Sequence, residues 1–232
     1  MVQSNRPTFA LITSACSKTG RLYANELAER GINLLLLDFP SMGLSELAIE
    51  LEQKNIIVHC FEFDFLKREQ FHEFSKWIQQ GFKIKMLVNI ASFECKGSFL
   101  ASQIEYIHHI FQMNIRSTNN ITKLVIPILL QQKDSVLLNV SSLGDISLLN
   151  YKTVYKSSRQ LIKQYTELLQ EELKNKGLKV KWIDLGYQGK QSIFNDNLNF
   201  INRFISFNFR SPQGLVIDSI KNITTHSFLK SN

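Results

Sequence analysis

The stretch Gly31-Ile-Asn-Leu-Leu-Leu-Leu-Asp38 decides the fold class of this chain. Its four consecutive leucines are apolar without alternation, which is the pattern of a strand buried on both faces in a parallel sheet. A helical pattern over Arg21–Arg30 precedes this strand and stops at Gly31, a residue type that often follows the last turn of a helix. Asp38 ends the run with a charge, so we expect its carboxylate at the carboxyl end of the strand.

The same alternation of strand and helix continues on both sides of this stretch. The predicted strands are Phe9–Thr13, Asn33–Asp38, Ile56–Phe63, Met86–Ile90, Ser135–Val140 and Lys179–Leu185. The predicted helices are Arg21–Arg30, Leu44–Gln53, Gln70–Gln80, Gln103–Leu130 (one long helix, or two that break near Pro127) and Val154–Lys176. Alternation with such short connections is typical of a doubly wound, mostly parallel α/β sheet of the Rossmann-like type. We predict a single domain over residues 1–232, with a substrate lid at 188–210.

The composition excludes several classes of protein. The chain is 44% hydrophobic and 20% charged, which is ordinary for a globular protein and excludes a disordered or fibrous one. It contains no run close to the ~20 apolar residues of a membrane-spanning helix, and Met1–Thr8 does not resemble a secretory signal. The three cysteines Cys16, Cys60 and Cys95 predict neither a disulfide framework nor a metal site, and they favour a reducing, cytoplasmic location.

The net charge of +7 is carried by the C-terminal third of the chain. Residues 1–150 hold 14 basic and 14 acidic side chains, whereas residues 151–232 hold 13 basic and 6 acidic ones. This excess indicates either an anionic ligand or partner, or a solvated basic surface. Aromatic residues do not alternate with a basic run as they do in single-strand binders, so we expect no nucleic-acid partner.

The loop Thr13-Ser-Ala-Cys-Ser-Lys-Thr-Gly20 follows the first strand, where doubly wound sheets bind their ligands. Dinucleotide sites usually have three glycines here, which let a pyrophosphate approach the backbone N–H groups of a helix N-terminus. This loop has only Gly20, although Lys18 could place its ammonium on the pyrophosphate. Asp38, about 20 residues further on, can bind ribose hydroxyls and repel a 2′-phosphate, which favours NAD over NADP. The alternative is that Asp38 is a turn residue before Pro40.

A second group of residues points to proton transfer. Tyr155 and Arg159 are four residues apart on a predicted helix, so their side chains can meet on one face. A tyrosine has a usual pKa of about 10, and a nearby cation lowers the pKa of the phenol. Ser142 ends the preceding strand, and its hydroxyl can polarise a substrate carbonyl. Together they predict an acid–base site beside a hydride donor. The alternative is two exposed polar residues on a helix face.

With these motifs the sequence resembles the short-chain dehydrogenase/reductase family, and most closely its 17β-hydroxysteroid dehydrogenase and 3-ketoacyl reductase branch. The resemblance implies an oxidoreductase that interconverts a carbonyl and a secondary alcohol, with NAD or NADP as cofactor and NAD favoured. It also implies an apolar small-molecule substrate and a homodimer or homotetramer. The implied catalytic residues are Ser142, Tyr155, Arg159 and Asn114, and the implied cofactor-binding residues are Thr13, Ser14, Lys18, Gly20, Asp38, Asp64, Asn89 and Gly186.

Four departures from the family pattern leave a second hypothesis open. Ser14 and Lys18 occupy two glycine positions of the first loop, Ser92 replaces a third glycine, and Arg159 stands at the position of the catalytic lysine. Arginine keeps the charge, but its longer planar head fits the nicotinamide ribose differently, so Arg159→Lys is expected to raise turnover. The alternative function is a catalytically silent family member that acts as a scaffold or regulatory partner.

Overall fold

A computed structural model of the chain describes residues 7–91, 103–141 and 152–184, all of which belong to the compact unit Met1–Phe194. Several predicted features lie outside the described residues and remain predictions: Ser142, Gly186, the lid at 188–210 and the extension of the single domain through Asn195–Asn232.

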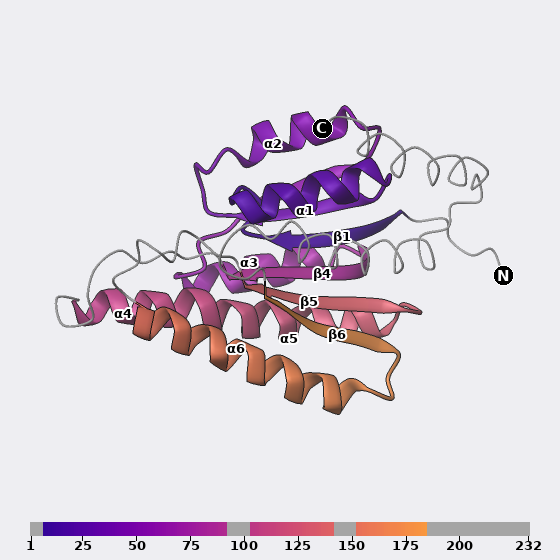
Figure 1. Cartoon of the computed structure of the whole chain (residues 1–232). Helices are drawn as coiled ribbons and strands as arrows, with labels where there is room; N and C mark the ends of the chain where they lie inside the picture. The colour runs from indigo at the N-terminus through magenta and orange to yellow at the C-terminus, as the bar shows by residue number, and fades with distance from the viewer. Residues whose placement is uncertain (1–6, 92–102, 142–151, 185–232) are drawn as a thin grey trace, which may run out of the picture. The chain divides into compact units, whose positions relative to one another are not determined.

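The described part of the chain contains one sheet of six strands, all parallel, in the order β3-β2-β1-β4-β5-β6. Figure 1 labels β1, β4, β5 and β6, which follow one another in this order. The strands are β1 (Thr8–Thr13), β2 (Asn33–Asp38), β3 (Val58–Glu62), β4 (Lys83–Ala91), β5 (Ser135–Ser141) and β6 (Leu178–Asp184). The chain first builds outward from β1 to β3 and then returns to add β4 on the other side of β1. This reversal confirms the predicted doubly wound fold and places the topological switch point between β1 and β4.

Helices cover both faces of the sheet. They are α1 (Lys18–Glu29), α2 (Leu44–Glu52), α3 (Arg68–Ile78), α4 (Ile104–Phe111), the π-helical turn η2 (Gln112–Arg116), α5 (Ser117–Leu130) and α6 (Lys152–Leu173). Helices α1 and α2 pack on β1, β2 and β3, while α5 packs on β4 and β5 and α6 on β5 and β6 (Figure 1). None of the helices in the described ranges is long and apolar enough to span a membrane.

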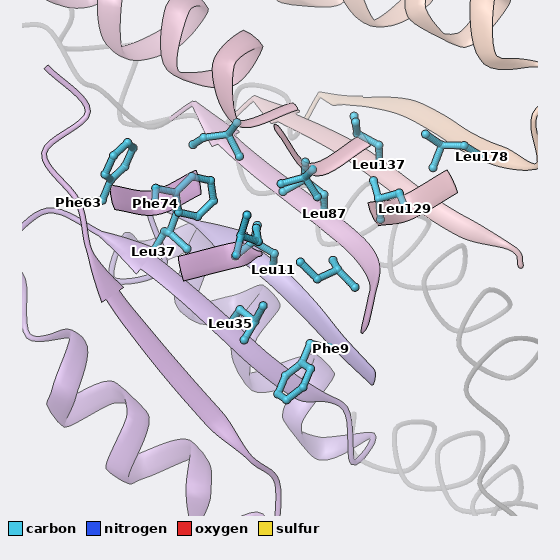
Figure 2. Packing of buried hydrophobic residues seen from close by; sticks show 14 of the residues in the cluster. Phe9, Leu11, Leu35, Leu37, Phe63, Phe74, Leu87, Leu129, Leu137 and Leu178 are labelled. Atoms are coloured by element: carbon cyan, nitrogen blue, oxygen red, sulfur yellow. The ribbon is translucent and has the colours of Figure 1, made fainter. Parts of the chain in front are cut away.

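The leucine run that predicted a buried strand is buried throughout. Leu34, Leu35, Leu36 and Leu37 are all 0% exposed, because successive side chains of β2 point to opposite faces and each face is covered by helices. Leu35 and Leu37 belong to the cluster that α3, α5 and α6 form with the sheet, together with Phe74 of α3 (Figure 2). This burial fixes the register of the strands and therefore the positions at which they end.

Of the two alternatives predicted for Gln103–Leu130, the single long helix is confirmed and the break near Pro127 is wrong. Pro127 lies inside α5, which continues to Leu130, and its neighbours Ile126 and Ile128 pack against the same core cluster. Burial of the last turn outweighs the hydrogen bond that proline cannot donate. The long helical segment is irregular at a different place, the π-helical turn η2, whose central residue is Asn114. Single π-helical turns inside α-helices occur frequently at functional sites.

Candidate active site

The carboxyl ends of the parallel strands bring the two predicted parts of the site to one edge of the sheet. Thr13 ends β1 and Asp38 ends β2 on the nucleotide side. On the catalytic side Ser141 ends β5, and its register partners are Ala91 at the end of β4 and Asp184 at the end of β6. Ser142 follows Ser141 directly, so the chain enters the undescribed segment 142–151 from this edge.

Ser14, which occupies a glycine position of the loop, is turned toward the sheet. Its φ of 49° is in the left-handed region, which glycine adopts without cost and other residues rarely adopt. The Ser14 hydroxyl donates to the carbonyl oxygen of Ile90 on β4 at 3.1 Å. This hydrogen bond holds the Ser14 side chain against β4.

The start of α1 is fixed by Ser17. The Ser17 hydroxyl accepts from the N–H of Gly20 at 3.0 Å and donates to the carbonyl of Ser14 at 2.7 Å. A Cβ on Gly20 would overlap the carbonyl oxygen of Ser14 and come within 2.7 Å of the Ala15 backbone. Glycine is therefore required at position 20 by the packing of the loop on its own helix.

Lys18 is the first residue of α1 and is exposed. The first turn of this helix contains no acidic residue, and within the described residues no hydrogen bond or ion pair involves the Lys18 ammonium. A cation at a helix N-terminus is electrostatically unfavourable, because the helix dipole is positive there. An anion bound at this end would be attracted by both the dipole and the ammonium.

Asp38 is almost completely buried, at 3% exposure. One carboxylate oxygen accepts from the N–H of Cys16 at 2.6 Å and the other accepts from the N–H of Phe39 at 2.8 Å. Burial raises the pKa of Asp38 above its usual value, and the two backbone hydrogen bonds oppose that rise. Burial and, second, the Asp38 carboxylate raise the pKa of the Cys16 thiol to about 12, so this thiol is protonated at neutral pH. Asp38 thus ties the loop after β1 to the end of β2.

Thr13 and Asn89 join strands and helices beneath this edge. The Thr13 hydroxyl accepts from the N–H of Ile90 at 2.9 Å. The Asn89 side-chain amide donates to the Thr122 hydroxyl at 2.9 Å and to the side-chain carbonyl oxygen of Asn139 at 3.0 Å. Asn89 is 2% exposed, and its Oδ1 has no hydrogen-bond partner among the described residues. Through these hydrogen bonds Thr13 links β1 to β4, and Asn89 links β4 to α5 and β5.

Asp64 lies in the loop that follows β3. Its carboxylate accepts from the N–H of Leu66 at 3.0 Å, and its other oxygen is 3.5 Å from the Lys67 ammonium. The side chain is 20% exposed, so it is less buried than Asp38. The resemblance assigns this aspartate to the adenine, and its position after the third strand is compatible with that assignment.

Tyr155 and Arg159 meet on α6 as their spacing predicts. The Arg159 guanidinium carbon lies 5.5 Å from the centroid of the Tyr155 ring. Its Nη2 donates to the Asp184 carboxylate at 2.6 Å, at the end of β6. Tyr155 is 2% exposed and the Arg159 side chain 12% exposed, which excludes the alternative of two exposed polar residues.

Asn114 reaches the same part of α6 from the π-helical turn. Its amide donates to the Ser158 hydroxyl at 3.2 Å, and this hydroxyl donates to the backbone carbonyl of Tyr155 at 2.8 Å. Thr118 donates to the Asn114 carbonyl at 2.9 Å. Asn114 is 1% exposed, and its Oδ1 lacks a hydrogen-bond partner in the described part of the chain. The structure therefore brings Asn114, Tyr155 and Arg159 together.

The sequence reasoning missed two residues of this site, Asp184 and Ser158. Asp184 carried a signal, because it is an acidic residue near the carboxyl end of a predicted strand and directly precedes Leu185-Gly186. An arginine at a buried position also requires a carboxylate partner. Ser158 gave no signal, because a serine inside a helix has no distinctive pattern.

Three comparisons with known proteins agree with this geometry. The sequence model of the family described as short chain dehydrogenase matches residues 8–193. The very-long-chain 3-oxoacyl-CoA reductase of Neurospora crassa is 30% identical over 178 residues, which are 75% of this chain and 54% of that protein. The chain spans about half the length of the curated relatives that it matches first.

Solved structures share the fold at lower sequence identity. A short-chain dehydrogenase from Sphingobium yanoikuyae in complex with NADPH has a TM-score of 0.72 and 18% identity, and the match covers 85% of each chain. A 3-ketoacyl-(acyl-carrier-protein) reductase from Brucella melitensis complexed with NADH has a TM-score of 0.67 and 23% identity, covering 77% of this chain and 75% of that chain. The chain belongs to the short-chain dehydrogenase family, as the resemblance to its ketoacyl reductase branch predicts.

Proposed function

We propose that this short-chain dehydrogenase interconverts an apolar ketone and the corresponding secondary alcohol, with a nicotinamide dinucleotide as the hydride carrier. One observation carries the proposal: a buried tyrosine, Tyr155, lies under the guanidinium of Arg159 at the carboxyl edge of the sheet. A cation near a phenol stabilises the phenolate, which is the form that removes a proton from an alcohol. In the reverse direction Tyr155 gives its proton to the oxygen of the ketone.

The other catalytic roles follow from position. Ser142 comes directly after Ser141 at the end of β5, and we assign its hydroxyl to holding the substrate oxygen. Asn114 is assigned to the proton path, because its buried Oδ1 has no partner within the described ranges and can accept a hydrogen bond from a water. Arg159 supplies the positive charge beside the phenol.

The loop after β1 fits the phosphates of a dinucleotide. Lys18 places an ammonium at the N-terminus of α1, and Ser14 is held back against β4 by its hydrogen bond to Ile90. Gly20 keeps the first turn of the helix close to the loop. We also assign three residues to the shape of this site, namely Thr13, Asn89 and Gly186. Asp64 is assigned to a contact with the adenine. When bound, the dinucleotide supplies the hydride for the ketone or takes it from the alcohol.

We propose NAD(H) in preference to NADP(H), on the strength of the negative charge at the end of β2. We expect the adenosine ribose to approach Asp38, and a carboxylate repels a 2′-phosphate. The positive charge of Arg21 opposes this preference, because it acts on Asp38 and offsets its negative charge. The Arg21 guanidinium is itself 3.7 Å from the Glu50 carboxylate, which offsets the charge of Arg21 in turn. Fluorescence titration of the protein with NADH and NADPH measures the preference directly.

We propose a substrate with a long apolar chain next to its carbonyl. The 30% identical relative from Neurospora crassa is named as a very-long-chain 3-oxoacyl-CoA reductase, which acts on such a carbonyl. The sequence between residues 188 and 210 is rich in Phe and Ile, and we assign it to an apolar lid. Relative rates on ketones of increasing chain length test this assignment, because an apolar site favours each added methylene.

We propose that the protein forms a homodimer or homotetramer through α6. Leu161 and Leu168 lie two helical turns apart on this helix and are 48% and 65% exposed, although they are apolar. Light scattering at tens of micromolar protein should give at least a dimer. Leu168→Glu should shift it to the monomer, whereas Ile49→Glu on α2, a site of 63% exposure, should not. A monomeric parent protein contradicts this part of the proposal.

The enzymatic proposal as a whole is tested by a rate measurement. The protein is mixed with NADH or NADPH and a panel of ketones, and the loss of absorbance at 340 nm is followed. We expect oxidation of the nucleotide with at least one apolar ketone and none with Tyr155→Phe. Nucleotide binding without turnover over the panel would favour the silent scaffold instead, and the absence of binding at millimolar nucleotide would exclude the dehydrogenase.

A further inference from the structure

The guanidinium of Arg159 is in contact with two groups that lie on different elements. It stacks over the ring of Tyr155 on α6, with its central carbon 5.5 Å from the ring centroid. It also donates from Nη2 to Asp184 at the end of β6, at 2.6 Å. Its Nε is buried and has no hydrogen-bond partner among the described residues. The Asp184 carboxylate is therefore the polar anchor that the structure gives to this charge.

We propose that Asp184 is a positioning residue that holds the Arg159 guanidinium over the Tyr155 ring, so that Arg159 and Asp184 act as a pair. This role rests on the proposed function in one respect, the assignment of Tyr155 as the proton-transfer group. Asp184 touches neither the substrate nor the phenol oxygen in this role, and it acts through Arg159.

An arginine suits such an anchor better than a lysine would. The side chain of Arg159 has four rotatable bonds along its stem, and without a partner its charged head gains hydration by moving toward solvent. The planar fork of the guanidinium can bind a carboxylate with one edge while its face rests on an aromatic ring. Asp184 meets this requirement, because β6 ends beside α6 and the aspartate is its last residue.

The strand register explains why the anchor is at this place. Asp184 is the register partner of Ser141, and Ser142 is the next residue along the chain. The ends of β5 and β6 therefore bring the anchor of Arg159 next to Ser141, the residue that precedes Ser142 in the sequence. A displacement of Asp184 would change the position of the charge relative to both Tyr155 and the substrate.

The test is a spectroscopic titration of Tyr155, in which the tyrosinate absorbance near 295 nm is followed as the pH is raised. The chain has six tyrosines, so each protein is compared with the same protein carrying Tyr155→Phe, and the difference belongs to Tyr155. We expect Asp184→Ala to move the ionisation midpoint of Tyr155 upward by about half a pH unit or more, on the order of a threefold gain in proton affinity. Arg159→Gln should move it in the same direction, and the double variant should move it no further than Arg159→Gln alone. Asp184→Glu should restore most of the parent midpoint.

A matched control is available on the same helix. Glu167 forms an exposed ion pair with Lys163 at 3.9 Å, and Glu167→Ala also removes a carboxylate from a basic partner on α6. This variant should leave the Tyr155 midpoint unchanged. Because Asp184 is 54% exposed at the end of a strand, Asp184→Ala is expected to fold, and circular dichroism checks this.

Two results would overturn the inference. A midpoint in Asp184→Ala equal to that in Glu167→Ala would mean that Asp184 does not position the charge. A lower midpoint would mean that Asp184 only neutralises Arg159, so that its removal strengthens the cation. Neither result depends on turnover, because the titration needs no nucleotide or ketone. Failure of the proposed function would appear separately, as the absence of ketone reduction by the parent protein.

Discussion

Two regions of this protein accommodate unusual residues in different ways. One is the nucleotide loop, Thr13–Gly20, and the other is the catalytic end, where α6 and β6 bring Arg159 and Asp184 together. In the loop, the partners of the key side chains are backbone groups: Ser14 donates to the Ile90 carbonyl, and Asp38 accepts from the N–H groups of Cys16 and Phe39. At the catalytic end, the main contact is between two side chains, Arg159 and Asp184. A backbone partner exists whichever residue supplies it, whereas a side-chain partner must be a particular residue.

This difference predicts how each region responds to substitution. In the loop, the effect of removing the Ser14 hydroxyl should not depend on which residue stands at position 90, because its partner there is a backbone carbonyl. At the catalytic end, the effect of changing one member of the pair should depend on the presence of the other.

The largest expected effect is the loss of activity in Tyr155→Phe. The phenol is the assigned acid–base group, and loss of such a group typically lowers the rate by about 10²–10⁴-fold. We expect turnover of any ketone to fall at least into this range, while the affinity for NADH, measured by fluorescence, stays within a factor of about two. The nucleotide loop is a separate region, so a loss of NADH binding in this variant would contradict the division of the site.

The next effect is a loss of stability in Gly20→Ala. The added methyl group would overlap the Ser14 carbonyl, which is backbone and cannot move without breaking the loop. We expect the free energy of unfolding in urea to fall by more than about 3 kcal/mol, the upper end of ordinary overpacking. Gly177→Ala is the control, since Gly177 has a φ of +77° but open space around its Cβ. It should cost only about 1–2 kcal/mol, and equal losses in both variants would contradict the steric argument.

Arg159→Lys should have a smaller effect on activity, and the structure reverses the sign expected from the sequence. A lysine has a compact ammonium that cannot rest on the Tyr155 ring and bind Asp184 with a planar fork. We expect kcat for ketone reduction to fall by about three- to tenfold, equivalent to about 1 kcal/mol. On the Asp184→Ala background the same substitution should change kcat less than twofold. A higher kcat in Arg159→Lys would mean that lysine suits this site better than arginine, and that the pairing with Asp184 does not compensate for the replacement.

The fold followed from the sequence because its signals are repeated along the chain. The leucines of β2 predicted a doubly buried strand, and Gly31 predicted the end of the helix before it, where this glycine has a positive φ. These patterns depend only on local burial and backbone conformation, which each segment expresses by itself. They therefore also located the loop after β1 and the ends of the strands.

The parts of the site that the sequence did not predict depend on contacts between distant segments. The pairing of Arg159 with Asp184 requires α6 to lie beside β6, which no pattern within either segment states. The π-helical turn at Asn114 has no periodic signature, since it inserts one residue into an otherwise regular helix. Pro127 left the prediction open between one long helix and two, because the packing of its neighbours decides whether the helix continues.

The smallest expected effect concerns Asp38 and the pH dependence of stability. Burial raises the pKa of Asp38 above its usual value of 3.8, so the folded protein holds this proton more tightly than the unfolded chain. The contribution of Asp38 to stability is then greatest below pH 3.8 and declines as the pH rises through the raised pKa. Asp38→Asn does not titrate. The difference in unfolding free energy, parent minus variant, should therefore fall as the pH rises from 3.8 through the raised pKa of Asp38.

The same variant separates the two roles of the Asp38 carboxylate. An asparagine has a single carbonyl oxygen, so the N–H of either Cys16 or Phe39 loses its acceptor, and the variant should be less stable than the parent at every pH. The loss of negative charge should also narrow the preference for NADH over NADPH in a fluorescence titration. If Asp38 only ties the loop to β2, stability falls and the nucleotide preference does not change. A stability difference that grows as the pH rises would mean that the backbone hydrogen bonds outweigh burial and hold the pKa of Asp38 below its usual value.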